Sequence, residues 1–108
     1  MIETGPLAPG ALEAAATFYE RHSGAVAQAI AGGAASVVLA MPAATYDHKD
    51  WRRTAARDLA RLHTPARVNV IGGGDPAAIN AISAYLAGAG AITGQYLPLA
   101  ASGDEHGG

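Results

Sequence analysis

The stretch Arg67-Val68-Asn69-Val70-Ile71-Gly72-Gly73-Gly74-Asp75-Pro76 decides the fold of this chain. Its first five residues are a short β-branched run that predicts a buried strand, and the three glycines after them predict a sharp turn. Asp75 is a favoured N-cap residue, and Pro76 suits the first position of a helix. A strand, a tight turn and a helix start in direct succession are typical of α/β proteins.

The same alternation of strands and helices continues on both sides of this stretch. Two further apolar runs have the length of strands, and three longer segments carry helical signals such as capping residues and terminal glycines. The further strands are expected over residues 36–41 and 92–99, and the helices over residues 11–31, 47–63 and 76–87.

The order of these elements is helix, strand, helix, strand, helix, strand, which indicates a parallel sheet. We therefore predict an α/β domain over residues 11–99, a partial Rossmann-like three-layer fold with about three strands and three helices. Residues 1–10 contain Gly5, Pro6, Pro9 and Gly10 and are interpreted as an N-terminal arm. Residues 100–108 are interpreted as a polar C-terminal tail.

Small residues make up much of the apolar half of the composition. Of the 108 residues 50% are hydrophobic, but 27 are Ala and 14 are Gly, and only 6% are aromatic. Such side chains bury little apolar area, so the core of one copy stabilises the fold weakly. Three parallel strands also leave two open edges. We therefore expect the domain to associate with another chain.

Composition also excludes several classes of function. The absence of Cys excludes a disulfide scaffold, thiol catalysis and thiolate metal sites. A formal net charge of −2 argues against binding nucleic acid. No apolar run approaches the ~18 residues of a membrane span, and the N-terminus lacks a secretory pattern, so we expect a cytoplasmic protein. No metal site is expected, because no metal-binding spacing relates the four histidines, His22, His48, His63 and His106.

Three segments resemble the short-chain dehydrogenase/reductase family, and they occur in the family's order. Residues 67–74 resemble its "RVN-hydrophobic-hydrophobic-x-Pro-Gly" strand and turn, and residues 57–62 its "LA-x-E-L" helix segment. Residues 75–99, which include Thr93-Gly94-Gln95, resemble its closing helix and "TGQ-hydrophobic" strand. The resemblance covers about residues 35–99 and implies the C-terminal half of the family fold, truncated with respect to the cofactor-binding half.

This resemblance implies that the chain alone binds no cofactor. The family's first half carries the glycine-rich turn that holds the dinucleotide phosphates at a helix N-terminus. Gly72, Gly73 and Gly74 lack that spacing, and Asp75 places a negative charge where a phosphate would lie. We expect no cofactor in this chain and NAD(P) in a partner subunit.

Tyr46 and Lys49 are the candidate catalytic residues. The family places a Lys four residues after its catalytic Tyr, where it activates the Tyr and binds the cofactor ribose. Here the spacing is three, and counting back from Leu59 aligns Lys49 with the family's Lys and Thr45 with its Tyr. Residues 42–44 provide no counterpart of the family's catalytic Ser. The resemblance therefore implies common ancestry, and it does not imply dehydrogenase activity.

These features favour a non-catalytic accessory subunit, a pseudoenzyme in a hetero-oligomer. The family associates through a bundle of its two long helices and through its final helix and strand, and the matching segments are present here. The expected partner is a full-length short-chain dehydrogenase/reductase subunit, or a second copy of the chain. The candidate interface residues are Phe18, Trp51, Ala55, Leu59, Ile82, Tyr85 and Tyr96.

Two alternative functions stay open. The first is a cofactor-independent isomerase or dehydratase that uses Tyr46 and Lys49 for proton transfer. The second is a homo-oligomeric module that binds a small ligand beside Gly72–Asp75. A cluster of arginines is interpreted as a solvated helix face, with an acidic partner surface or the phosphates of a CoA-type ligand as the alternative; its members are Arg52, Arg53, Arg57 and Arg61.

Overall fold

Four parallel strands form the sheet in the computed structural model of the chain, which describes residues 1–99. The central pair, β2 and β3, is in register over its whole length. The expected α/β class with a parallel sheet is therefore confirmed. In spatial order the strands are β1 (Ile2–Glu3), β2 (Ser36–Met41), β3 (Arg67–Gly72) and β4 (Tyr96–Pro98).

β1 is a strand that the sequence pattern does not reveal. Ile2 pairs with Leu39 and Glu3 with Ala40, and the Thr4 amide donates to the Ala40 carbonyl at 3.0 Å. The expected N-terminal arm therefore begins inside the sheet, which has one strand more than the three expected. Two residues are too few to show a period, so only pairing with β2 defines this strand.

Two helices, α1 (Ala11–Arg21) and α2 (Ser23–Ala31), replace the single helix expected over residues 11–31. The interruption lies at His22. Beside it the Ser23 hydroxyl donates to the carbonyl of Tyr19 at 2.6 Å. A Ser that bonds back to the preceding turn in this way bends a helix. The break is therefore a local effect of one side chain.

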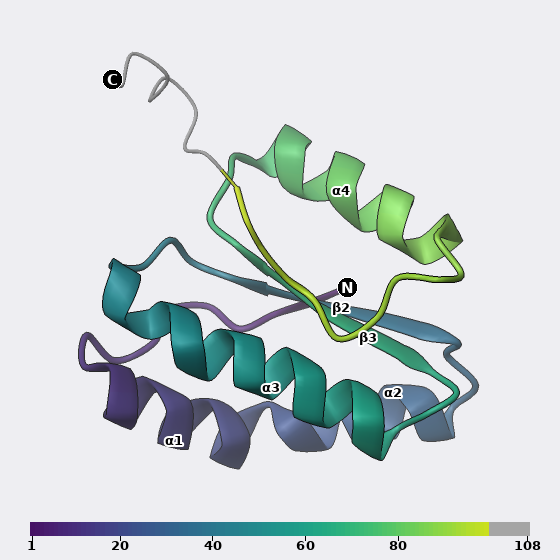
Figure 1. The fold of residues 1–108 in the computed structure, drawn as a ribbon, viewed down its shortest axis with the longest axis horizontal. Coiled ribbons are helices and arrows are strands. Elements are labelled where there is room, and N and C mark those ends of the chain that lie inside the picture. Colours follow the sequence, from purple (N-terminus) through teal and green to yellow (C-terminus); the bar gives the residue numbers. More distant parts are fainter. Residues whose placement is uncertain (100–108) are drawn as a thin grey trace.

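The helices cover the two faces of the sheet unequally. Figure 1 shows α1, α2 and α3 (Lys49–Leu62) together on one face and α4 (Pro76–Gly88) alone on the other. A short 3₁₀ turn, η1 (Tyr46–His48), leads into α3. α4 begins as expected, because the Asp75 carboxylate accepts a hydrogen bond from the Ala78 amide at 2.8 Å. This arrangement gives three layers.

A hydrophobic core lies on each face of the sheet. The core beneath α1, α2 and α3 is the larger, and includes Phe18, Val26, Leu39, Leu59 and Val70. The core beneath α4 contains only three fully packed residues, Val38, Ile71 and Leu86. Because α4 alone does not cover all four strands, a cavity remains beside β1 on this face of the sheet.

β4 begins four residues later than expected, and both backbone and side-chain hydrogen bonds join β3 to the segment before it. Asn69 is fully buried, and its side chain donates to the Ile92 carbonyl at 3.1 Å and accepts from the Gln95 amide at 3.0 Å. Gly94 between these residues has a φ of 73°, a conformation that interrupts a strand. Residues 92–95 therefore form a loop held by Asn69.

Arg67, at the start of β3, makes hydrogen bonds to the C-terminal end of α4. Its guanidinium donates to the carbonyls of Leu86, Ala87 and Ala89 at 3.1, 3.2 and 2.7 Å. The carbonyls of Leu86 and Ala89 also accept backbone hydrogen bonds, so Arg67 adds to the partners of these carbonyls at the helix C-terminus. Arg67 and Asn69 thus connect β3 to the elements that follow it. The tail expected over residues 100–108 lies outside the described residues.

Candidate functional site

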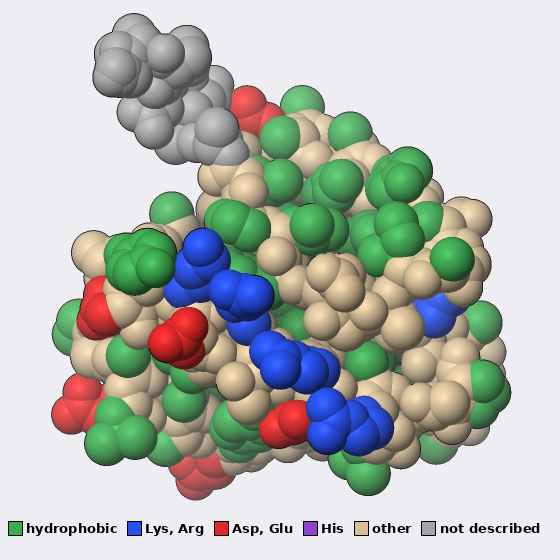
Figure 2. Space-filling view, viewed as in Figure 1, with side chains coloured by type: hydrophobic (Ala, Val, Ile, Leu, Met, Phe, Trp, Pro, Cys, Tyr) green, Lys and Arg blue, Asp and Glu red, His purple; other side chains and the backbone are tan. Residues whose placement is uncertain are grey.

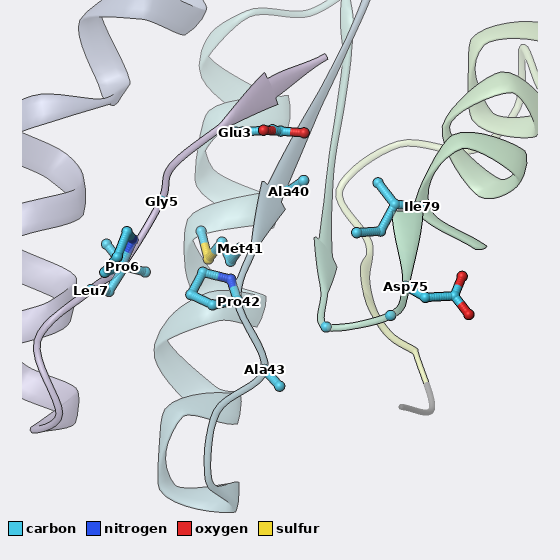
Figure 3. A pocket seen from close by; sticks show the side chains of 12 residues that line it. Glu3, Gly5, Pro6, Leu7, Ala40, Met41, Pro42, Ala43, Asp75 and Ile79 are labelled. Atoms are coloured by element: carbon cyan, nitrogen blue, oxygen red, sulfur yellow. The ribbon is translucent and has the colours of Figure 1, made fainter. Parts of the chain in front are cut away.

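A cavity of about 750 Å³ lies at the carboxyl ends of β1, β2 and β3. Ligands of open α/β sheets bind at this edge of the sheet. Its walls come from the loops after the three strands and from the first turns of α4 (Figure 3). The walls are mainly apolar, and include Leu7, Ala40, Met41, Pro42, Ala43 and Ile79.

Only two titratable side chains line this cavity, and both are carboxylates. Figure 3 shows Ile79 reaching toward Ala40, while the carboxylate of Asp75 points away from it. Glu3 is exposed, and Asp75 is engaged as the N-cap of α4. The cavity therefore offers apolar contact and negative charge, and no basic side chain among residues 1–99 lines it.

The glycine turn beside the cavity is explained by backbone geometry and packing. Gly73 and Gly74 have φ values of 74° and 89°, which disfavour any residue with a side chain. A Cβ on Gly74 would lie 2.7 Å from Leu99 Cδ1, and one on Gly73 would lie 3.3 Å from the Leu99 carbonyl. The turn packs against Leu99, and Asp75 occupies the helix start. These residues do not fit a dinucleotide pyrophosphate.

Tyr46 and Lys49 lie together, but away from this cavity. The Lys49 ammonium is 5.4 Å from the centre of the Tyr46 ring, and Tyr46 is 83% exposed. Neither side chain lines the cavity at the carboxyl ends of the strands. Proton transfer by this pair stays a prediction; if it occurs, Tyr46→Phe should abolish turnover of a carbonyl substrate.

A basic row follows the exposed side of α3. Figure 2 shows it as a blue band along the helix. Lys49, Arg53 and Arg57 line a groove of about 590 Å³ against Tyr96, and Arg61 continues the row. Three of the expected arginines thus share one exposed face, because residues four apart in a helix do so. The interpretation as a solvated face is wrong for the fourth, Arg52, which is buried.

Arg52 is only 1% exposed and projects toward the sheet. Its Nη1 donates to the Pro42 carbonyl at 2.9 Å and contacts the Tyr96 hydroxyl at 3.3 Å. The guanidinium carbon lies 5.6 and 5.9 Å from the ring centres of Trp51 and Tyr96. Sequence analysis missed this burial. The available signal was helical spacing, since Arg52 shares a face with three buried apolar residues, Ala55, Ala56 and Leu59.

His48 is a second buried polar residue that sequence analysis missed. The Trp51 indole donates to His48 Nδ1 at 3.0 Å, so the proton of this ring lies on Nε2. Nε2 then donates to the Pro9 carbonyl at 2.9 Å. Both ring nitrogens have partners, and His48 joins the chain after β1 to the start of α3. Among residues 1–99 no cluster of three side chains is suited to hold a metal ion.

Three of the seven candidate interface residues are unavailable to another chain. Phe18, Ala55 and Leu59 are at most 4% exposed and belong to the larger core of the protomer. Apolar residues at helical spacing form the face by which a helix packs on the core of its own protein, so this spacing alone does not indicate an interface with a partner. Trp51 and Tyr96 are half-buried against the same core. The expectation of an interface is therefore corrected for Phe18, Ala55 and Leu59, and for Trp51 and Tyr96 it stays a prediction.

The other two candidates, Ile82 and Tyr85, lie at a groove between α4 and β4. The groove has a volume of about 380 Å³, and Ile92 and Leu97 form its opposite wall. Tyr85 is 59% exposed, and Ile82, Ile92 and Leu97 are half-buried. Figure 2 shows hydrophobic side chains gathered over α4. We call this surface the α4–β4 groove.

Two exposed or half-buried groups have shifted pKa values. Burial, and secondarily the carboxylate of Asp58, raise the pKa of Tyr19. A hydrogen bond from the Thr45 hydroxyl lowers the pKa of Asp47. Asp47 lies in η1 and Tyr19 on α1, so neither group belongs to the cavity. The shifts bear on stability at the extremes of pH.

Comparison with known proteins adds one match. The family model described as "Short chain dehydrogenase-like protein" matches residues 2–99. No curated protein and no solved structure gives a significant match. No helix within residues 1–99 is both long and apolar enough to span a membrane.

Proposed function

Because the chain belongs to the short chain dehydrogenase-like family, we propose that it is a non-catalytic member that associates with a full-length dehydrogenase/reductase subunit. The strand order supports this. A doubly wound sheet has the order 3-2-1-4-5-6, and its dinucleotide turn follows strand 1. The parallel order from β1 to β4 is linear and lacks the reversal beside strand 1 at which the dinucleotide binds. NAD(P) would then belong to the partner.

The observation that carries this proposal is the α4–β4 groove. Tyr85 stands 59% exposed beside Ile82, Ile92 and Leu97 at an open edge of the sheet. An apolar surface at an unpaired edge strand is a ready site for another chain. Aromatic side chains such as Tyr85 are favoured at the centre of such interfaces.

A full-length relative is the partner that fits this surface. The family resemblance implies that full-length members associate through their own final helix and strand. When two chains present the same elements, they can pair about a twofold axis, with each surface contacting its equivalent. The chain and its partner would thus use matching faces. A pair of identical chains satisfies the same geometry and is distinguished by mass.

Co-purification with a tagged full-length relative tests the proposal. We expect the wild-type chain to be retained, and Tyr85→Glu to be lost, because it places a charge in an apolar interface. Tyr46→Glu is the matched control, since Tyr46 is 83% exposed and lies outside the groove. Retention of both variants, or of neither the variants nor the wild type, would contradict the proposal.

The cavity at the strand ends supports a second candidate function, a homo-oligomeric module that binds a small ligand. Gly73, Gly74 and Asp75 line the cavity, together with an apolar wall that includes Ile79. The apolar side chains and carboxylates that line the cavity favour an apolar or cationic ligand over a phosphate. A thermal-shift screen of nucleotides, acyl-CoAs and apolar amines tests this. An increase in Tm that Ile79→Glu removes would support it, and no increase with any compound would exclude these ligands.

A further inference from the structure

The guanidinium of Arg52 is a buried positive charge without a negative partner among residues 1–99. Its polar contacts are the Pro42 carbonyl and the Tyr96 hydroxyl, both of them neutral. The only ion pair of the described chain joins Arg61 and Asp58 on the surface. An uncompensated buried charge is costly, and buried charges in proteins are normally paired. A negatively charged ligand would therefore offset the free-energy cost of this unpaired buried charge.

Nη2 is the donor of this guanidinium that a ligand can reach. Both hydrogen bonds that the described residues make with the guanidinium use Nη1. Nε has no hydrogen-bond partner, but it is fully enclosed by protein atoms. Nη2 makes no hydrogen bond within residues 1–99 and is not fully buried. Nη2 is thus suited to a charge-assisted hydrogen bond with one oxygen of a carboxylate.

Arg52 lines a pocket of about 210 Å³ next to the larger cavity. On the scale of ~30 Å³ for a water molecule, the pocket holds about seven waters. Its other walls are mostly apolar, and include Leu7, Pro9, Pro42 and Ala43. The one other basic side chain in the lining, His48, already has partners on both ring nitrogens. The pocket therefore presents one cationic side chain beside mainly apolar walls.

From these observations we propose that Arg52 binds a small monocarboxylate with a short apolar chain. The carboxylate accepts a hydrogen bond from Nη2, and the hydrocarbon part contacts Leu7 and Ala43. No carboxylate side chain among residues 1–99 lines the pocket to repel it. The site is independent of the α4–β4 groove, since the two share no lining residue.

Calorimetric titration with sodium butyrate, at an ionic strength held constant with sodium chloride, tests the proposal. We expect saturable binding to the wild type and to the control Arg53→Leu, whose side chain is exposed one residue further along α3. Arg52→Leu should bind at least about tenfold more weakly, the loss expected for one charged hydrogen bond. Equal binding to Arg52→Leu, or no saturable binding to the wild type, would overturn the proposal.

A second measurement keeps the test valid if Arg52→Leu does not fold. In a titration of the wild type followed by nuclear magnetic resonance, butyrate should shift the amide signals of Leu7, Ala43 and Ala44, which line the pocket. Shifts confined to the basic groove at Arg53 and Arg57 would overturn the proposal, because they would place the anion on the surface of α3. Acetate and propionate should bind more weakly than butyrate, in the order of their apolar area.

Discussion

Replacing Asn69 should destabilise the protein more than any exposed polar substitution. The side chain is fully buried on β3 and makes two hydrogen bonds, to Ile92 and Gln95 at 3.1 and 3.0 Å. Asn69→Ala removes both bonds and leaves a carbonyl and an amide without their partners. Each lost bond costs about 1 kcal/mol, and a buried unpaired group costs more. The expected loss is about 2–4 kcal/mol of the free energy of unfolding.

Urea denaturation followed by circular dichroism measures this loss. The matched control is Asn80→Ala, because Asn80 is exposed within α4, where Ala is the better helix former. The control should change the free energy of unfolding by less than about 0.5 kcal/mol. A loss below about 1 kcal/mol for Asn69→Ala, or equal losses for both variants, would refute the account of the loop before β4.

Three further perturbations have defined outcomes. Arg67→Ala should lower the free energy of unfolding by about 1–3 kcal/mol, since it removes hydrogen bonds to three carbonyls at the end of α4; urea denaturation that shows no loss would refute this role of Arg67. Gly74→Ala should cost about 1–3 kcal/mol, because φ is 89° and a Cβ meets Leu99; an unchanged denaturation midpoint would contradict this. The raised pKa of Tyr19 contributes stability that is fully present below its ordinary pKa of 10.0 and is lost as pH rises through the folded pKa; a spectroscopic titration should show a tyrosine with a raised pKa that Tyr19→Phe removes, and a titration that Tyr19→Phe leaves unaltered at high pH would refute it.

The central part of the fold is predictable because local signals agree there with the tertiary structure. Residues 37–41 and 68–71 of β2 and β3 are buried on both faces of the sheet, which is why all of them except Asn69 are apolar. Asp75 and Pro76 start α4 by local chemistry alone. Such signals need no knowledge of distant residues. β1 and the loop held by Asn69 depend on partners far along the chain, and no local pattern reports them.

The candidate site was less predictable, for the same reason. Tyr46 and Lys49 are close in sequence, and they do lie together. The two buried basic residues, His48 and Arg52, make hydrogen bonds to Pro9 and Tyr96, which lie far from them in the chain. A basic residue is ordinarily assigned to the surface. Arg52 is buried instead, and it lines the smaller pocket.

Native mass spectrometry of the chain co-expressed with the full-length short-chain dehydrogenase/reductase encoded nearest to it tests the central claim most directly. The account predicts a complex whose mass is a sum of the two different chains, and which Tyr85→Glu dissociates. The observation of only monomers or of a complex of identical chains, with the full-length enzyme assembling alone, would contradict it.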